Sequence, residues 1–227
     1  MPNDSQPLQR LNESGFLHIA NAVSHLICDQ FQLVSRTIDG AGSRTLLAHP
    51  TCREIVIHLK SHLVVASLLP SDPVAIQCTL FDKSPKKNWL VSLHQDLSIP
   101  VRERTQNSEC SGWSQKEGQW FVQPPVNVLE GLVAVRVHLD ASTADNGPLR
   151  VVPGSHLQGR LASSEADAQR QATGEVSVLA ARGDAIAMRP LLLHASSKAI
   201  VPRPRRVLHF VFGPRELTHG LAWAHVV

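Results

Sequence analysis

The residues with the clearest chemical potential are a histidine and an aspartate two positions apart, His94 and Asp96. In an extended chain, residues i and i+2 project from the same face, so both side chains can reach one ion. One imidazole, one carboxylate and a second histidine from elsewhere form the facial triad of non-haem iron(II) oxygenases, which leaves open coordination positions. The same spacing occurs at His138 and Asp140, so the pair alone does not identify the metal site.

The high histidine content also favours a metal site. The chain has 12 histidines and no tyrosine among 227 residues, and imidazole is the commonest metal ligand and a general acid or base. Tyrosine is therefore excluded as an acid, base or ligand. The net charge of +3 and the 4% of aromatic residues give little support to nucleic-acid binding.

Short strands are expected to position these residues from about residue 70 onward. Residues 132–139 alternate, with valines on one face and Ala134, Arg136 and His138 on the other. The other expected strands are 74–81, 89–94, 149–152, 176–179, 185–193 and 206–212. Strands without intervening helices indicate a closed or two-sheet antiparallel structure. Residues 98–130 lack periodicity, and we expect a long loop that forms one wall of the site.

The first 70 residues have helical periodicity. Ser24 is a candidate N-cap and Gly40 a candidate stop for a helix whose apolar positions are Ile27, Phe31, Val34 and Ile38. A second helical stripe contains Ile55, Leu59, Leu63 and Ala66. We expect one domain over residues 1–227, with a helical cap (1–70), a jelly-roll core (71–215) and a tail (216–227).

Three further features concern the setting of the protein. The longest apolar run is well short of the ~18 residues of a membrane-spanning helix. The first residues have neither the basic nor the apolar region of a signal peptide. Four separated cysteines with no C-x-x-C pair suit a reducing compartment rather than a disulfide scaffold. We expect a cytoplasmic protein without membrane or nucleic-acid partners; no oligomeric state follows from the sequence.

Three ordered motifs resemble the phytanoyl-CoA dioxygenase family, which includes ectoine hydroxylase. They are Leu80-Phe-Asp-Lys83 through Asn88-Trp89 to His94-Gln-Asp96, Asn146-Gly-Pro-Leu-Arg-Val-Val-Pro-Gly-Ser-His156, and Met188-Arg-Pro-Leu-Leu-Leu-His194-Ala-Ser196-Ser. The resemblance is close over residues 74–213 and looser over the first 70. It implies a mainly β fold, a double-stranded β-helix or jelly roll with an N-terminal helical cap. It also implies Fe(II) as cofactor and 2-oxoglutarate as co-substrate with O₂.

The resemblance assigns the catalytic metal ligands. Carried onto this sequence, they are His94, Asp96 and His194. Asp140 leads directly into a turn sequence, and we interpret it as a turn former rather than a ligand.

The resemblance also implies the residues that bind 2-oxoglutarate. Arg205, eleven residues after His194, matches the family's basic residue for the distal carboxylate. A guanidinium suits this role because its planar fork pairs with a carboxylate through two hydrogen bonds and keeps its charge. Ser196 matches a hydroxyl directed at the same carboxylate. Gln77 and Thr79 match positions that line the co-substrate pocket in ectoine hydroxylase.

Candidate substrate contacts are less specific. Arg136 and His138 share the polar face of their strand, so either they contact substrate or they are surface-exposed or satisfied core residues. His209 shares a face with the co-substrate arginine, and Trp113 lies in the expected loop wall. Arg206 lies on the opposite face of its strand and is expected to reach out at the sheet edge.

By resemblance, the reaction is decarboxylation of 2-oxoglutarate coupled to hydroxylation of an unactivated C–H bond of a small molecule. The carboxylate of Asp96 favours hydroxylation, because related halogenases have a small residue at this position. Two alternatives remain: a non-catalytic jelly-roll binding protein, and a cupin-like metalloenzyme that does not use 2-oxoglutarate. The presence of all three ligands and of Arg205 argues against both.

Overall fold

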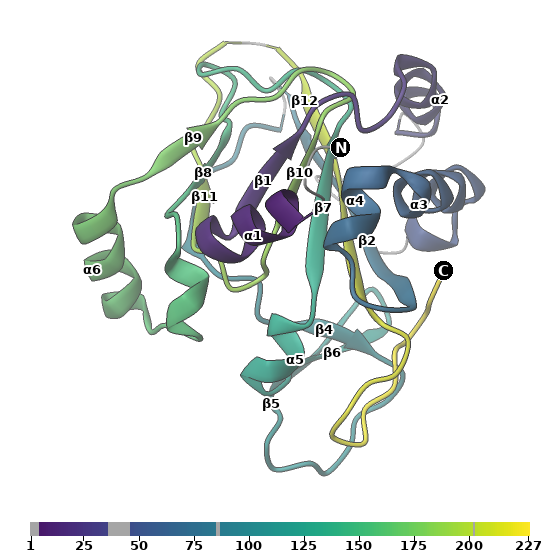
Figure 1. Cartoon of the computed structure of the whole chain (residues 1–227), viewed down its shortest axis with the longest axis vertical. Helices are drawn as coiled ribbons and strands as arrows, with labels where there is room; N and C mark the ends of the chain where they lie inside the picture. Colours follow the sequence, from purple (N-terminus) through teal and green to yellow (C-terminus); the bar gives the residue numbers. More distant parts are fainter. Residues whose placement is uncertain (1–4, 36–45, 85–86, 202) are drawn as a thin grey trace.

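Two antiparallel β-sheets face each other in the computed structural model, which describes residues 5–35, 46–84, 87–201 and 203–227 (Figure 1). The larger sheet has the order β1 (Phe16–Ile19), β10 (Ala185–Met188), β7 (Val133–His138), β12 (Arg205–Pro214) and β2 (Pro73–Lys83). The second has the order β3 (Val91–His94), β11 (His194–Ser196), β8 (Leu149–Val151) and β9 (Val176–Val178). The predicted mainly β jelly roll is confirmed.

Strand β7 illustrates why the larger sheet is buried on both faces. Its valines, Val133, Val135 and Val137, pack into the main hydrophobic core together with residues of the N-terminal helices. The alternate residues Arg136 and His138 are also buried, and they face the second sheet. The alternation predicted for residues 132–139 is therefore present, and its polar face lines the interior between the sheets.

The N-terminal helices cover the outer face of the larger sheet (Figure 1). They are α1 (Ser5–Ser14), α2 (His25–Ser35), η1 (Leu46–Ala48), α3 (Pro50–Ser61) and α4 (Leu63–Leu68). Elsewhere lie α5 (Val126–Glu130), η2 (Ser155–Gln158) and α6 (Ser163–Thr173), which packs beside β3 through Ala166 and Leu93. None of the described helices has the length and apolar character that crossing a membrane requires.

The N-terminal 70 residues differ from the expectation in two ways. Residues 16–19 form the edge strand β1, which pairs with β10, instead of a helix. The second expected helix is interrupted at His62, whose extended backbone ends α3 and caps α4. This break changes the helical phase, so Leu63 is 75% exposed and Ala66 is exposed, while Val65 is buried. The first expected helix corresponds to α2. The Oγ of Ser24, just before it, accepts a hydrogen bond from the N–H of Ile27, as expected of an N-cap. Ile38 and Gly40 lie outside the described residues.

Residues 98–130 form ordered structure instead of the expected loop. They contain a small sheet with the order β4 (Ile99–Val101), β6 (Gln119–Gln123) and β5 (Ser111–Lys116), followed by α5. The C-terminal residues lie against it, because Trp223 forms a β-bridge with Val101. Ile99 and Phe121 of this segment line a cavity described below, so the segment does form a wall.

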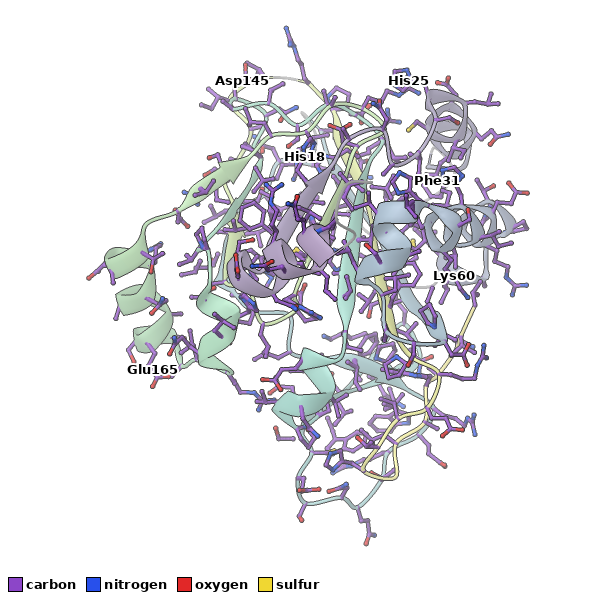
Figure 2. All side chains as sticks on the ribbon, viewed as in Figure 1. His18, His25, Phe31, Lys60, Asp145 and Glu165 are labelled. Carbon is purple, nitrogen blue, oxygen red and sulfur yellow. The ribbon has the colours of Figure 1, made fainter. Side chains whose placement is uncertain are left out.

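The packing of α2 predicts a contrast between two of its residues. Phe31, labelled in Figure 2, is fully buried in the main core, whereas Leu26 is 68% exposed. Phe31→Ala should lower the free energy of unfolding by about 3–5 kcal/mol, because it removes a buried ring and leaves a cavity. Leu26→Ala should change it by less than about 0.5 kcal/mol. Urea denaturation of both variants measures the difference; equal effects would show that α2 does not pack on the sheet.

Candidate metal centre

The three predicted metal ligands lie together at one end of the second sheet. His94 ends β3 and His194 begins β11, and the antiparallel pairing of these strands places the two residues directly opposite each other. The Nε2 atoms of His94 and His194 each lie 3.7 Å from an oxygen of Asp96, which follows β3. One ligand atom from each residue falls within 4.8 Å of the others, a spacing that suits one metal ion.

Backbone carbonyls orient both imidazoles for metal binding. The Nδ1 of His94 lies 2.8 Å from the carbonyl oxygen of Ser92, and the Nδ1 of His194 lies 2.9 Å from that of Leu192. A carbonyl oxygen only accepts hydrogen bonds, so Nδ1 carries the proton in each neutral ring. The lone pair is then on Nε2, the atom that faces Asp96. This tautomer is the one that a metal ligated through Nε2 requires.

Burial and neighbouring charges set the protonation of the ligands. Burial lowers the pKa of His194 to about 4, so the ring is neutral at physiological pH and its lone pair is available. For Asp96, burial alone raises the pKa, but the facing His194, His209 and His94 outweigh it and lower the pKa below its ordinary value. The donor set of two imidazoles and one carboxylate fits a non-haem iron(II) centre.

Two cavities meet at Asp96, which lines both together with Phe81. The inner cavity has a volume of about 70 Å³, and its lining includes His94, His194, Ser196, Arg205 and Arg136. The large cavity has a volume of about 280 Å³, and its lining includes Gln77, Thr79, His209, Ile99 and Phe121. A metal ion held by Asp96 and the two histidines would therefore border two separate compartments.

Buried cationic groups cluster beside the inner cavity, which Arg205 and Arg136 line and which Lys83 approaches through Ser196. Arg205 is 3% exposed, and its Nη2 lies 3.5 Å from the Oγ of Ser196. The Nζ of Lys83 donates to the same oxygen at 2.7 Å and also to the carbonyl of Ser197. Sequence analysis did not single out Lys83 as a functional residue. Lys83 ends β2, and the pairing of β2 with β12 places it directly opposite Arg205. Its position in the motif that runs from Leu80 to Asp96 is the sequence feature that could have indicated it.

Several nitrogen atoms of this cluster are buried without a hydrogen-bond partner. They are the Nε and Nη1 of Arg205 and the Nε of Arg136. Burial lowers the pKa of both arginines to about 10, so both remain charged at neutral pH. Among the described residues, neither arginine nor Lys83 forms an ion pair with a carboxylate. Unpaired buried donors of this kind are complementary to an anion.

The structure places Gln77 and Thr79 on the other side of Asp96 from Arg205 and Ser196. Both line the large cavity, and the Nε2 of Gln77 donates to the Oγ1 of Thr79 at 3.0 Å. Neither lines the inner cavity. Their predicted role in co-substrate binding stays a prediction, and their position favours contact with whatever enters the large cavity.

The four candidate substrate residues are spread over different environments. His209 lines the large cavity, whereas Arg136 lines the inner one. His138 is fully buried, and neither of its ring nitrogens has a hydrogen-bond partner. Trp113 stacks edge-on against Trp120, with ring centroids 6.4 Å apart, and lines neither cavity.

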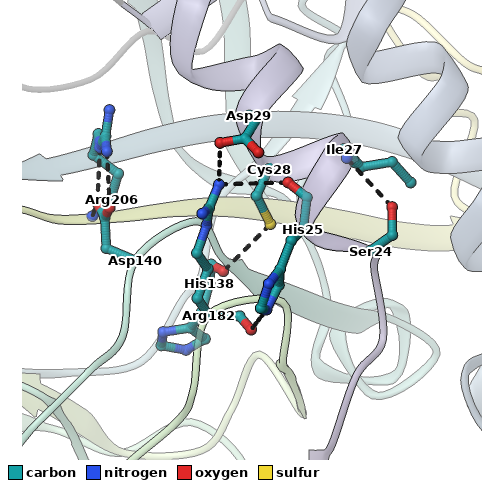
Figure 3. Close-up of polar contacts among 9 residues, drawn as sticks. All are labelled: Ser24, His25, Ile27, Cys28, Asp29, His138, Asp140, Arg182 and Arg206. Atoms are coloured by element: carbon teal, nitrogen blue, oxygen red, sulfur yellow. Dashed lines mark hydrogen bonds and ion pairs between the residues drawn. The ribbon is translucent and has the colours of Figure 1, made fainter.

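The alternative pair, His138 and Asp140, does not form a metal site in this structure. Asp140 accepts hydrogen bonds from the backbone N–H, the Nε and the Nη2 of Arg206, at 2.7–2.9 Å (Figure 3). Both of its carboxylate oxygens are thus used to hold β12. The sequence suggested that Arg206 reaches out at the sheet edge. In the structure its guanidinium bonds to Asp140 instead.

These contacts predict opposite effects for two aspartates. Asp96→Ala should weaken Fe(II) binding by more than about 100-fold, beyond the loss typical of a residue that only supports a ligand. Asp140→Ala should leave Fe(II) affinity unchanged and lower the free energy of unfolding by about 2–3 kcal/mol, because it removes charge-assisted hydrogen bonds. Anaerobic metal titration and urea denaturation measure the two effects. Loss of iron binding in a folded Asp140→Ala protein, but not in Asp96→Ala, would reverse the assignment.

The burial of His138 predicts a dependence of stability on pH. Burial, with Arg136 and Arg205 nearby, lowers the pKa of His138 to about 3 in the folded state, whereas an unfolded histidine titrates near 6.5. The unfolded chain therefore binds the proton first, and stability falls as the pH drops below 6.5. This residue should contribute up to about 1.4 kcal/mol per pH unit. Urea denaturation of the metal-free protein between pH 7 and 5 should show a shallower decline for His138→Leu; an identical decline in both proteins would contradict the neutral, buried state.

Solved structures with a similar fold are non-haem enzymes. The non-heme alpha ketoglutarate dependent carbocyclase SnoK from nogalamycin biosynthesis is 15% identical, with a TM-score of 0.70, over 95% of this chain and 85% of its own. The epimerase SnoN, in complex with Fe3+, alpha ketoglutarate and nogalamycin RO, is 14% identical, with a TM-score of 0.68, over 93% and 83%. EctD from S. alaskensis is 18% identical, with a TM-score of 0.68, over 94% and 78%.

The sequence itself matches a protein family. A comparison with curated proteins found no match. The sequence profile of the family described as Phytanoyl-CoA dioxygenase (PhyH), however, matches residues 11–207, which is most of the chain. The Fe(II) and 2-oxoglutarate implied by the motifs agree with the donor set and with the solved SnoN complex. The chain therefore belongs to the phytanoyl-CoA dioxygenase family, as its motifs predicted.

Proposed function

We propose that this protein is an Fe(II)- and 2-oxoglutarate-dependent dioxygenase that hydroxylates an unactivated C–H bond of a small molecule. The observation that carries the proposal is the position of the His94, Asp96 and His194 triad between two cavities of different character. One cavity is small and cationic. The other is larger, and its lining mixes apolar side chains with several polar ones that could orient a small molecule.

Iron(II) at the triad, when bound, supplies the coupling of 2-oxoglutarate decarboxylation to O₂ activation and C–H oxidation. The residues of the inner cavity bind and orient the co-substrate. Arg205 offers two unpartnered nitrogens to its distal carboxylate. The ammonium of Lys83 adds positive charge beside them, and the Oγ of Ser196 accepts from Lys83 and Arg205 while it donates to the carbonyl of Gly147. Burial excludes water from this pairing, which strengthens the electrostatic attraction.

The large cavity supports a small-molecule substrate. Gln77, Thr79 and His209 offer polar contacts beside Asp96, and Ser98, Lys116 and Gln123 add polar groups among the apolar lining residues. Gln95 also lines this cavity, but its amide already bonds to the carbonyls of Gly159 and Leu191 and to the N–H of Leu161, so it is structural. A cytoplasmic setting belongs to the proposal, and the four cysteines, all buried as free thiols, support it.

Hydroxylation is preferred over the other outcomes of this chemistry because the ligand Asp96 is present; a small residue there is the arrangement of related halogenases. The epimerase and carbocyclase among the solved structures are alternative outcomes on the same fold. The cupin-like alternative leaves the buried, unpartnered nitrogens of Arg205 without an explanation, and the non-catalytic alternative leaves the complete set of metal ligands without one.

An anaerobic titration tests the proposal. Fe(II) and 2-oxoglutarate together should give the weak visible charge-transfer band of a chelated keto acid, whereas glutarate, which lacks the keto group, should give none. Admission of O₂ should then produce succinate slowly without added substrate. Bound iron with neither the band nor succinate would favour the cupin-like alternative. Failure to bind both iron and 2-oxoglutarate would favour a non-catalytic protein.

Adjacent arginines on β12 provide a sharper test of the co-substrate site. Arg205→Ala should raise the KM for 2-oxoglutarate by roughly 30-fold or more, because loss of one partner of a desolvated charge pair costs about 2–5 kcal/mol. Arg206→Ala should change it by less than about threefold, because Arg206 bonds to Asp140 outside the inner cavity. Both KM values are measured at fixed iron by succinate formation. Equal effects, or a larger one for Arg206→Ala, would place the co-substrate elsewhere.

A further inference from the structure

A third histidine approaches the metal-ligating carboxylate. The Nε2 of His209 lies 3.7 Å from the Oδ2 of Asp96, as close as the Nε2 atoms of His94 and His194 are to the same carboxylate. His209 nevertheless does not join the group of ligand atoms that lie within 4.8 Å of one another. It lies on the opposite side of Asp96, at the wall of the large cavity.

The hydrogen bond on the far side of its ring distinguishes His209 from the two ligands. Its Nδ1 lies 3.1 Å from the Nη1 of Arg136. A guanidinium only donates, so Nδ1 must hold the lone pair and Nε2 must hold the proton in the neutral ring. In His94 and His194 the partner of Nδ1 is a carbonyl, and the proton is on the other nitrogen. The ligands therefore present lone pairs to the metal site, whereas His209 presents an N–H to Asp96.

Packing fixes this arrangement. Arg136 and His209 are directly opposite each other on β7 and β12, and they are 7% and 4% exposed. The guanidinium of Arg136 lies over the ring of Phe81, 5.2 Å from its centroid, and the same ring meets His209 edge-on at a centroid distance of 5.8 Å. The cation–π contact holds Arg136 in place. Neither side chain is therefore free to turn away from its partner.

From this geometry we propose that His209 is a positioning residue for Asp96. Its N–H faces the carboxylate oxygen Oδ2 at 3.7 Å, close enough to hydrogen-bond after a small shift of either group, and Arg136 keeps the ring in the tautomer that can donate. With Oδ2 engaged by His209, Asp96 would offer a metal ion its other oxygen. A carboxylate that used both oxygens would occupy a coordination position that 2-oxoglutarate and O₂ need. The inference rests on the proposed metal site and adds a role for two residues outside it.

Metal affinity without co-substrate or substrate separates this role from substrate binding. Co(II) is the probe, because it does not react with O₂ under these conditions and its visible absorption reports on coordination number. His209→Leu should weaken Co(II) binding by about 10–100-fold, the range typical of residues that orient a metal ligand, and should change the visible spectrum. His209→Gln retains a side-chain N–H donor and an acceptor for Arg136, and should restore affinity to within about threefold.

Two further variants complete the comparison. Arg136→Leu frees the ring to adopt either tautomer and should weaken Co(II) binding, by less than His209→Leu does. Val211→Ala alters the same strand and the same cavity wall without a polar contact to Asp96, and should leave Co(II) affinity unchanged. Nitrogen NMR of the Zn(II)-loaded protein, which needs no substitution, should show the proton of His209 on Nε2.

The outcomes are separable from those of the proposed function. If the unmodified protein does not bind Co(II), the metal site itself is wrong. If it binds and a folded His209→Leu protein binds equally well with the same spectrum, His209 does not position Asp96. Equal losses in His209→Leu and His209→Gln, or a proton found on Nδ1, would also overturn the inference. If His209→Leu does not fold, the Gln variant and the NMR measurement decide.

Discussion

Burial of positive charge between the two sheets is the constraint on which the site depends. Lys83 and Arg205 meet at the oxygen of Ser196, and Arg136 is buried on β7. None of the three has a carboxylate partner among the described residues. Unpaired buried charge is costly, so hydrogen bonds, aromatic faces or an incoming anion must compensate it. The interior is therefore complementary to an anion, as the proposed co-substrate site requires. The same burial keeps His138, His194 and His209 neutral, because it lowers the pKa of each ring.

The register of the strands determines which residues lie on each side of Asp96. Pairing of β12 with β2 and β7 sets Arg205 opposite Lys83, and sets His209 between Thr79 and Arg136. Alternation along β12 sends these side chains inward and Arg206 outward to Asp140. One strand thus supplies the proposed co-substrate anchor, the group that faces Asp96 and a structural ion pair.

Much of this arrangement could be predicted from the sequence, because residues 132–139 alternate cleanly and three motifs resemble one family. Other parts could not. Residues 16–19 are too few to show a strand period, and β5 is mostly exposed and polar, so its alternation carries no apolar signal. Lys83 could not be predicted as a site residue because lysine is ordinarily exposed. Strand β2 also continues to Lys83, beyond the last of its apolar residues. The assignment of Gln77 and Thr79 to one side of the metal required the position of the cavities.

The central claim is that one triad separates a cationic co-substrate cavity from a substrate cavity. The most direct measurement is an anaerobic crystal structure with Fe(II) and 2-oxoglutarate. The account predicts iron bound to His94, Asp96 and His194, with the distal carboxylate within hydrogen-bond distance of Arg205 and Ser196. Iron at a different set of residues, or a distal carboxylate lying beside Gln77 and Thr79 in the large cavity, would contradict it.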